Sequence, residues 1–390
     1  MTTELAEPAD SVPGSGVPAE PSETVLAAER LLTARLGAQV ELADPEDLGG
    51  SDSSVVLRVR VARNPFSLSR TLVVKRRTAQ APQAVAGAFA REAASCQLFT
   101  ALHTDERPGP ALIASDPEQQ LLVLEDLGRA GTVESVLLSG DRAQAQRALL
   151  DWAHALGKLH AATAGREADF AALLRRQGSD GLSDPLQQQG GAALGGLPTL
   201  LVDELGLSTP PDLGDDIRRA AQLLDGQRFR AFSPADLGAD NAVVVGRTVR
   251  FIDFEGGAFR TAALDAAQLR TPLPSSGSDH ALPAGVVDDM QSTWLDEAAT
   301  LWPELADRRL ADGLLLDGQL VWTWLGTWWL LHRPDAGGHG ALVDRWQRLA
   351  IDAAALDRSV LAGYASEVCS ALRDRFDVAN DGVALYPVFD

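Results

Sequence analysis

Three oxygen-bearing side chains lie on what the sequence predicts to be loop ends beside a hairpin. Asp236 and Asn241 are five residues apart between apolar segments, and Asp253 follows twelve residues after Asn241, at the end of an apolar run. Carboxylate and amide oxygens are the hard ligands that Mg²⁺ prefers. An Asp and an Asn at this spacing are a weak signal alone. Followed by a strand, a turn, a second strand and a further Asp, they predict a magnesium site.

A second candidate pair lies upstream of these residues. Lys75 is one of only two lysines among 34 basic residues and closes an apolar strand. Glu92 falls into the apolar stripe of an expected helix, so its carboxylate should point into the protein, where it needs a partner. We expect Lys75 to be that partner; the alternative is that Glu92 lies at the edge of its stripe and Lys75 is a surface charge. The stripe consists of Val85, Phe89, Cys96 and Phe99.

The surrounding patterns predict the elements that position these residues. Alternating apolar residues predict a hairpin, and 3.6-residue periodicity predicts amphipathic helices. Strands are expected near Val40, over 55–61, 72–75 and 121–124, and again over 242–245 and 249–252. Helices are expected over 22–36, 83–102 and 141–163, as short pieces broken by glycines over 165–228, and from 286 onward.

This order of elements predicts an α+β protein with two lobes. A tail over 1–21, rich in Pro, Gly, Ser and Glu, is expected to be disordered. Residues 22–127 should form a small lobe with an antiparallel sheet and one key helix, and residues 128–390 a larger, mainly helical lobe. The length of 390 residues suits such a division.

Composition excludes several classes of protein. The net charge of −20 and pI of about 4.7 argue against a nucleic-acid partner, which would require a basic face. Cys96 and Cys369 are far apart, and no signal peptide is apparent, so we expect a cytoplasmic protein without a disulfide framework. The most apolar stretch, Leu320 to Leu331, is shorter than a bilayer requires, so no membrane partner is expected.

These residues together resemble the kinase-like phosphotransferases of the aminoglycoside phosphotransferase and choline kinase type. The resemblance runs in order over roughly residues 40–270, and the ordered set is specific although each piece alone is not. The matching pieces are the Gly/Ser turn at 48–54, Val74-Lys75, Arg91-Glu92, the hinge-like Leu122-Val123-Leu124-Glu125-Asp126-Leu127-Gly128, Leu156-Gly157-Lys158-Leu159-His160, the stretch from Asp236 to Asn241, and Ile252-Asp253-Phe254-Glu255.

The resemblance implies a bilobal protein-kinase-like fold and roles for individual residues. Asp236 would accept the proton of the substrate hydroxyl or orient that hydroxyl. Lys75 would hold the nucleotide phosphates with Glu92 fixing its direction, and Asn241 and Asp253 would bind Mg²⁺. Nucleotide contacts are expected from Gly49, Gly50, Ser51, Ser53, Ser54, Lys75, Glu125 and Leu127. His160 and Asp265 would buttress the catalytic loop, and Lys158 should be a surface residue of its helix.

The implied activity is ATP- and Mg²⁺-dependent phosphorylation of a small-molecule hydroxyl. The acceptor would be aminoglycoside-like, an amino sugar or an amino alcohol, and the acidic larger lobe permits a cationic one. Pro234-Ala235-Asp236 stands where the family usually has His-Gly-Asp, so a catalytically silent domain that binds nucleotide or a partner is the alternative.

Two features of the larger lobe remain open between structural and substrate-binding roles. Its Trp-rich segment is expected to be a core helix, or else to place an indole beside the acceptor. Its acidic helical region forms a solvated face, or else meets a polycation. The tryptophans are Trp322, Trp324, Trp328 and Trp329, and the acids are Asp288, Asp289, Asp296 and Glu297.

Overall fold

The computed structural model describes residues 21–51, 54–63, 68–78, 87–179, 183–270, 280–379 and 382–390. The chain divides into two compact units, one formed by Met1–Val85 with Ile113–Asp126 and the other by Ala86–Leu112 with Leu127–Asp390. The first unit carries a five-stranded sheet and the second is mainly helical, so the predicted α+β class is confirmed. The lobe boundaries at 21 and 127 stay predictions, and the expected tail lies outside the described residues apart from Pro21.

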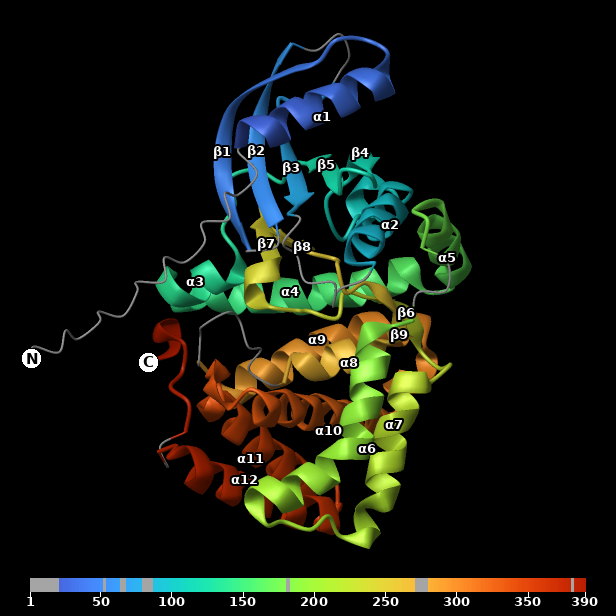
Figure 1. Cartoon of the computed structure of the whole chain (residues 1–390). Coiled ribbons are helices and arrows are strands. Elements are labelled where there is room, and N and C mark those ends of the chain that lie inside the picture. Colours follow the sequence, from blue (N-terminus) through green and yellow to red (C-terminus); the bar gives the residue numbers. More distant parts are fainter. Residues whose placement is uncertain are drawn as a thin grey trace, which may run out of the picture. The chain divides into compact units, whose positions relative to one another are not determined.

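The smaller unit is a sheet covered on one face by a helix (Figure 1). The sheet has the order β1-β2-β3-β5-β4, and the three pairs among β1, β2, β3 and β5 are antiparallel. Alternate residues such as Leu57 and Val74 share one buried cluster with Ala28 and Leu32 of α1. The bounds are α1 Pro21–Leu36, β1 Glu41–Ser51, β2 Ser54–Arg63, β3 Thr71–Arg77, β4 Leu112–Asp116 and β5 Leu121–Glu125.

The first strand differs from the expectation. The sequence predicts a short strand near Val40 and a turn over 48–54, but β1 continues to Ser51, which pairs with Ser54. Two register shifts after Ala43 and Asp47 accommodate the Asp, Pro and Gly residues that obscured the alternation. Gly50 lies so close to β2 that a Cβ there would be 2.2 Å from the Ser54 carbonyl oxygen. The glycines therefore form part of a bulged strand.

The larger unit contains eleven of the α-helices in the described part of the chain and two small sheets (Figure 1). The strands β6 and β9 form one two-stranded antiparallel sheet and β7 and β8 the other. The strands are β6 Arg230–Ser233, β7 Ala242–Val245, β8 Thr248–Phe251 and β9 Ala258–Thr261. The helices are α2 Ala88–Thr100, α3 Val133–Ser139, α4 Arg142–Thr163, α5 Glu167–Arg176, α6 Pro185–Leu205, α7 Gly214–Asp225, α8 Ala262–Gln268, α9 Ala284–Leu301, α10 Arg308–His332, α11 His339–Ala355 and α12 Ser359–Phe376.

The helix α6 corrects the prediction that glycines break residues 165–228 into short helices. It is continuous over 21 residues although it contains four glycines and Pro198. A Cβ at Gly190 would lie 2.7 Å from a Leu224 methyl group, and one at Gly196 would lie 2.5 Å from the Trp328 ring. Close packing of neighbouring side chains therefore explains these glycines, and it offsets their low helix propensity.

The Trp-rich segment lies in α10 and belongs mainly to the core. Trp324 is fully buried and donates a hydrogen bond to the Ala193 carbonyl, while Trp322 donates to the Leu264 carbonyl. Trp329 is 43% exposed. The core interpretation is therefore confirmed for the first two tryptophans. Within the described ranges, no helix is both long and apolar enough to cross a membrane.

Candidate functional site

A loop between β6 and β7 (residues 234–241, the Asp236 loop) carries two of the predicted site residues. The backbone amide of Asn241 donates to the Gly238 carbonyl at 3.0 Å, which closes a short 3₁₀ turn (Ala239–Asn241). The backbone carbonyl of Asn241 accepts a hydrogen bond from the backbone amide of Ile252 at 3.0 Å. Because Ile252 directly precedes Asp253, the β7–β8 hairpin brings Asn241 and Asp253 to one end, as the sequence pattern predicts.

The carboxyl group of Asp236 has an unusual acidity. The residue is exposed to solvent, yet the protein around its carboxyl group still displaces water, and this desolvation raises its pKa to about 6. A hydrogen bond from the Gly238 amide at 3.0 Å opposes the rise. The negative charges of Asp240, Asp253 and Glu255 add to it. A carboxylate with a pKa this close to neutral pH is suited to accept a proton.

Two residues of the site have left-handed backbone conformations. Ala235 has φ +71° and Asp253 has φ +63°, a region that costs L-residues about 1–2 kcal/mol. The Ala235 carbonyl accepts a hydrogen bond from Gln268 of α8 at 3.0 Å. Next to Asp253, Phe254 is fully buried with its ring 4.8 Å from that of Phe99. Each strained residue is therefore held in place by an adjacent anchor.

A buried chain of hydrogen bonds braces the start of the Asp236 loop. The Ser233 hydroxyl donates to Asp265 Oδ1 at 2.7 Å, and His160 Nε2 lies 3.1 Å from Asp265 Oδ2. Trp294 of α9 donates to His160 Nδ1 at 3.0 Å. His160 and Asp265 are fully buried. The prediction that these two residues buttress the loop is confirmed, whereas the roles of Ser233 and Trp294 were not foreseen.

Arg260 of β9 is a second brace that the sequence did not reveal. Its guanidinium is 2% exposed and donates to the carbonyl and hydroxyl oxygens of Ser233 and to the Gly256 carbonyl. The same group forms a two-pronged ion pair with Asp184 at 2.6 and 2.7 Å. Asp184 also caps α6 through the Leu186 amide. One buried arginine therefore links the loop, the turn after Asp253 and the first turn of α6.

Lys75 lies in β3 of the smaller unit, between Val56 of β2 and Leu122 of β5. Leu72 and Val74 of the same strand face α1. Because successive side chains of a strand point to opposite faces, Lys75 lies on the other face of the sheet. The prediction that Lys75 lies in a strand is therefore confirmed, although the strand does not close at Lys75 but continues to Arg77. Lys158, the other lysine, is exposed on α4, as predicted.

Glu92 lies in α2 and is 3% exposed, so its predicted burial is confirmed. It belongs to the larger unit and Lys75 to the smaller one. The pairing of the two side chains stays a prediction.

The predicted nucleotide contacts fall in several places. Gly49, Gly50 and Ser51 end β1 and Ser54 begins β2, while Ser53 lies outside the described residues. Glu125 ends β5 opposite Leu72, and Leu127 follows in the larger unit. Their roles stay predictions.

The predicted magnesium ligands suit a cation that also binds phosphate. In the described part of the chain, no group of three or more His, Cys, Asp or Glu side chains could hold a metal alone. Mg²⁺ usually takes one or two protein ligands and completes its shell with water and substrate phosphates. Asn241 and Asp253 fit that pattern. The neighbouring carboxylates, which add to the desolvation that raises the Asp236 pKa, leave negative charge for a cation to offset.

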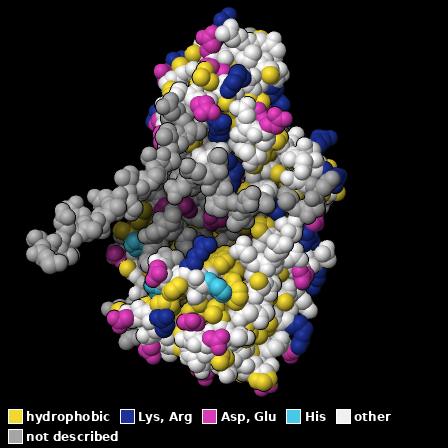
Figure 2. All heavy atoms as spheres, viewed as in Figure 1, with side chains coloured by type: hydrophobic (Ala, Val, Ile, Leu, Met, Phe, Trp, Pro, Cys, Tyr) yellow, Lys and Arg dark blue, Asp and Glu magenta, His cyan; other side chains and the backbone are white. Residues whose placement is uncertain are grey.

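The acidic side chains of α9 are mostly solvated. Asp288 pairs with Arg270 at 2.7 Å, and Glu297 lies 3.1 Å from His154 Nδ1. Asp289 and Asp296 are exposed. These ion pairs and exposures favour the solvated-surface interpretation. Acidic and basic side chains are also interspersed over the visible face of the larger unit in Figure 2.

Comparison with known proteins gives structural likenesses only. No protein-family model matches the chain, and no curated protein matches it. A choline/ethanolamine kinase family protein from Mesorhizobium loti is 15% identical, with 85% of this chain and 93% of that chain covered and a TM-score of 0.47. A choline kinase from Cryptosporidium parvum Iowa II is 13% identical, with 84% of this chain and 93% of that chain covered and a TM-score of 0.48. A thermostable mutant of aminoglycoside phosphotransferase APH(4)-Ia, in ternary complex with ADP and hygromycin B, is 13% identical, with 90% of this chain and 98% of that chain covered and a TM-score of 0.43.

Proposed function

We propose that this protein transfers the γ-phosphoryl group of ATP to a hydroxyl group of a small molecule, in a reaction that depends on Mg²⁺. The acceptor we propose is an aminoglycoside-like compound, an amino sugar or an amino alcohol. The observation that carries the proposal is the carboxyl group of Asp236, which is solvent-accessible, has a pKa of about 6 and lies on a braced loop near Asn241 and Asp253.

Asp236 acts on the acceptor in this proposal. Its carboxylate accepts the proton of the attacking hydroxyl, or orients that hydroxyl toward the phosphorus. Phosphoryl transfer needs positioning and charge neutralisation more than covalent catalysis. The brace through Ser233 and Arg260 supplies the positioning, because it fixes the backbone that precedes Asp236.

The remaining residues hold the nucleotide in this proposal. Lys75 contacts the phosphates as a compact cation and Glu92 fixes its direction. Asn241 and Asp253 hold Mg²⁺, which, when bound, neutralises charge on the phosphates. The segment 48–54 covers the nucleotide, and the backbone at Glu125 and Leu127 contacts its base.

A mass-spectrometric screen of hydroxyl compounds with Mg-ATP tests this function. We expect one added phosphate on at least one amino-bearing acceptor. Asp236→Asn should lower the rate by about 100-fold or more, since it removes the base. Asp240→Asn is the matched control, because it removes a neighbouring charge from the same loop, and it should retain most of the activity.

Nucleotide binding separates this proposal from the catalytically silent alternative. We expect ATP to raise the melting temperature, and more so with Mg²⁺. A shift with ATP but no phosphorylated product across the screen would favour the silent domain. No shift under either condition would contradict the kinase proposal and leave only a silent domain that binds a partner.

A further inference from the structure

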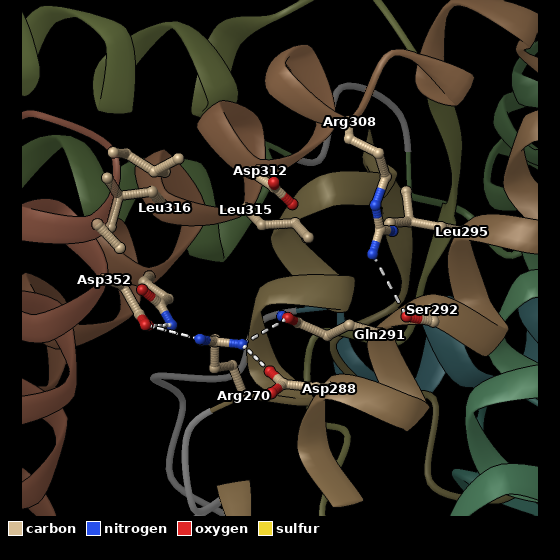
Figure 3. Close-up of a pocket in the computed structure, with 13 residues that line it drawn as sticks. Arg270, Asp288, Gln291, Ser292, Leu295, Arg308, Asp312, Leu315, Leu316 and Asp352 are labelled. Atoms are coloured by element: carbon tan, nitrogen blue, oxygen red, sulfur yellow. Dashed lines mark hydrogen bonds and ion pairs between the residues drawn. The ribbon is translucent and has the colours of Figure 1, made fainter. Parts of the chain in front are cut away.

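Two cavities beside α10 of the larger unit differ in the charge of their walls. In the cavity among α9, α10 and α11 (Figure 3), Arg270 is bound by Asp352 at 2.6 Å and by Asp288 at 2.7 Å. The other cavity, of about 520 Å³, lies among α7, α10 and the start of α12, and its volume is in the range of sites for small organic molecules. Four arginines and one aspartate line it, a formal charge of +3 in a protein of net charge −20. This second cavity is therefore positive although the protein is acidic.

Buried carboxylates neutralise two of these arginines. Arg358 Nη1 donates to Asp216 at 3.2 Å and also to Asp317. Arg219 pairs with the same two carboxylates. Arg358 Nη2 forms no hydrogen bond with a described residue and is not sealed from solvent, and a Cβ at Gly313 in the cavity wall would lie 3.6 Å from it. Arg358 therefore offers a fixed N–H donor at the cavity wall, although its charge is balanced.

The other two arginines, Arg228 and Arg309, are exposed. Within the ranges that the structure describes, neither forms an ion pair with a carboxylate. Arg228 is nevertheless positioned, because its guanidinium lies 4.7 Å from the centre of the Phe229 ring, which is 7% exposed and packs edge-on against Trp302. Arg309 lies in the first turn of α10, where a positive charge opposes the helix dipole, so helix stability does not favour an arginine there. A bound anion would offset the charge of both arginines.

Apolar side chains of the wall restrict which anion would bind. They belong to Leu223, Phe229, Leu310 and Leu314. An inorganic anion would leave this surface in contact with water, whereas a hydrocarbon group would cover it, and each Å² of apolar surface removed from water contributes about 25 cal/mol. Arginine guanidinium groups bind phosphate well, and a phosphate monoester carries close to two negative charges at neutral pH, which matches the two unbalanced arginines. The wall therefore favours a phosphate ester with a hydrocarbon part.

We propose that this cavity binds a small phosphate monoester with an aromatic or aliphatic body. The phosphate group pairs with the arginines of the wall, and the hydrocarbon part lies against the leucines. None of the lining residues belongs to the Asp236 loop, which follows the end of β6, whereas Phe229 precedes its start. Binding in the cavity requires neither nucleotide nor phosphoryl transfer, so the site is independent of the proposed catalytic function.

The test is a calorimetric titration of the full-length protein, without nucleotide, with phenyl phosphate. We expect a dissociation constant of about 0.1–1 mM that rises with salt, because salt screens exposed charges. Inorganic phosphate and phenol each retain one half of the ligand and should bind at least about tenfold more weakly. Equal binding of inorganic phosphate would indicate an adventitious ion only and would overturn the proposal. No binding of phenyl phosphate up to about 20 mM would overturn it as well.

Variants locate the site. Arg228→Gln and Arg309→Gln should each weaken binding of phenyl phosphate about tenfold or more, because each removes a charged partner of the phosphate group. Arg308→Gln is the matched control: Arg308 precedes Arg309 on α10 but lines the other cavity (Figure 3), so affinity should stay within about twofold. Gly313→Leu fills the cavity beside Arg358 and has the higher helix propensity, so it should abolish binding without lowering the melting temperature. Equal affinity in wild type, Arg309→Gln and Gly313→Leu would overturn the proposal.

Discussion

Trp294 fixes the protonation pattern of His160. The indole Nε1–H lies 3.0 Å from His160 Nδ1, and an indole nitrogen can only donate. His160 Nδ1 must therefore accept, which places the ring proton of neutral His160 on Nε2, 3.1 Å from Asp265 Oδ2. Asp265 in turn accepts from Ser233, so the tautomer of His160 is tied to the position of the Asp236 loop.

This relationship predicts the tautomer of His160. ¹⁵N NMR of histidine-labelled protein near pH 8 should show Nε2 protonated and Nδ1 unprotonated. Trp294→Phe leaves Nδ1 buried without a donor and should lower stability by about 1–3 kcal/mol or more. Trp329→Phe, at a 43% exposed tryptophan, should have little effect. A proton on Nδ1 in the wild type would contradict the assigned hydrogen bond.

The raised pKa of Asp236 predicts a pH-dependent stability difference. The folded pKa of about 6 exceeds the ordinary value of 3.8 for an aspartate, so ionised Asp236 disfavours folding. That penalty is absent below about pH 4, grows between pH 4 and 6, and is complete above pH 6. Asp236→Asn should therefore raise the melting temperature most above pH 6, with the gain fading toward pH 4. A gain that is constant with pH would rule out this origin.

The left-handed conformation of Ala235 predicts a stabilising substitution. Ala235→Gly removes the unfavourable placement of Cβ at φ +71° and should stabilise the protein by about 1 kcal/mol. The matched control is Ala239→Gly, which lies in the same loop outside the left-handed region and should destabilise by about 0.5–1 kcal/mol. Urea denaturation of the two variants measures both effects, and destabilisation by Ala235→Gly would show that Cβ packing outweighs strain.

The two lysines give a matched pair of conservative substitutions. Under the proposed function, Lys75→Arg should lower phosphate transfer by about 100-fold or more, because the planar guanidinium cannot replace a compact ammonium. Its melting temperature should change little, since Lys75 lies on the sheet face opposite α1. Lys158→Arg, at an exposed position, should change neither quantity. Near-normal turnover in Lys75→Arg would remove Lys75 from the site.

Local patterns in the sequence predicted the elements that are long or strongly periodic. Asp141 caps α4 as expected, with its carboxylate accepting from the Gln144 amide. The β2–β3 hairpin follows the alternation that predicted it, and the β7–β8 hairpin follows two short apolar runs on either side of a glycine-containing turn. His160 and Asp265 were placed correctly because each lies at a fixed position relative to a recognisable motif.

The features that the sequence did not predict depend on residues that are far apart along the chain. Arg260 and Asp184 are 76 residues apart, and neither has a local signal that would identify the other. The strands β6 and β9 have four residues each, too few for a period to be apparent. In α6, the sequence alone indicates that the glycines break the helix, because the close packing of Leu224 and Trp328 against them is apparent only in the structure. The relation of Lys75 to Glu92 stays a prediction.

The order of the segments along the chain determines when each unit can be completed during synthesis. The smaller unit is complete once residue 126 has been made, although α2 is encoded before its last two strands. Arg91 of α2 donates to the Ser183 carbonyl, and Gly257 approaches the Ser95 hydroxyl so closely that a Cβ there would be 2.6 Å from it. These partners emerge from the ribosome roughly 90 to 160 residues later. A nascent chain stalled soon after residue 126 would therefore carry all five strands of the sheet, while these two partners of α2 would still be missing.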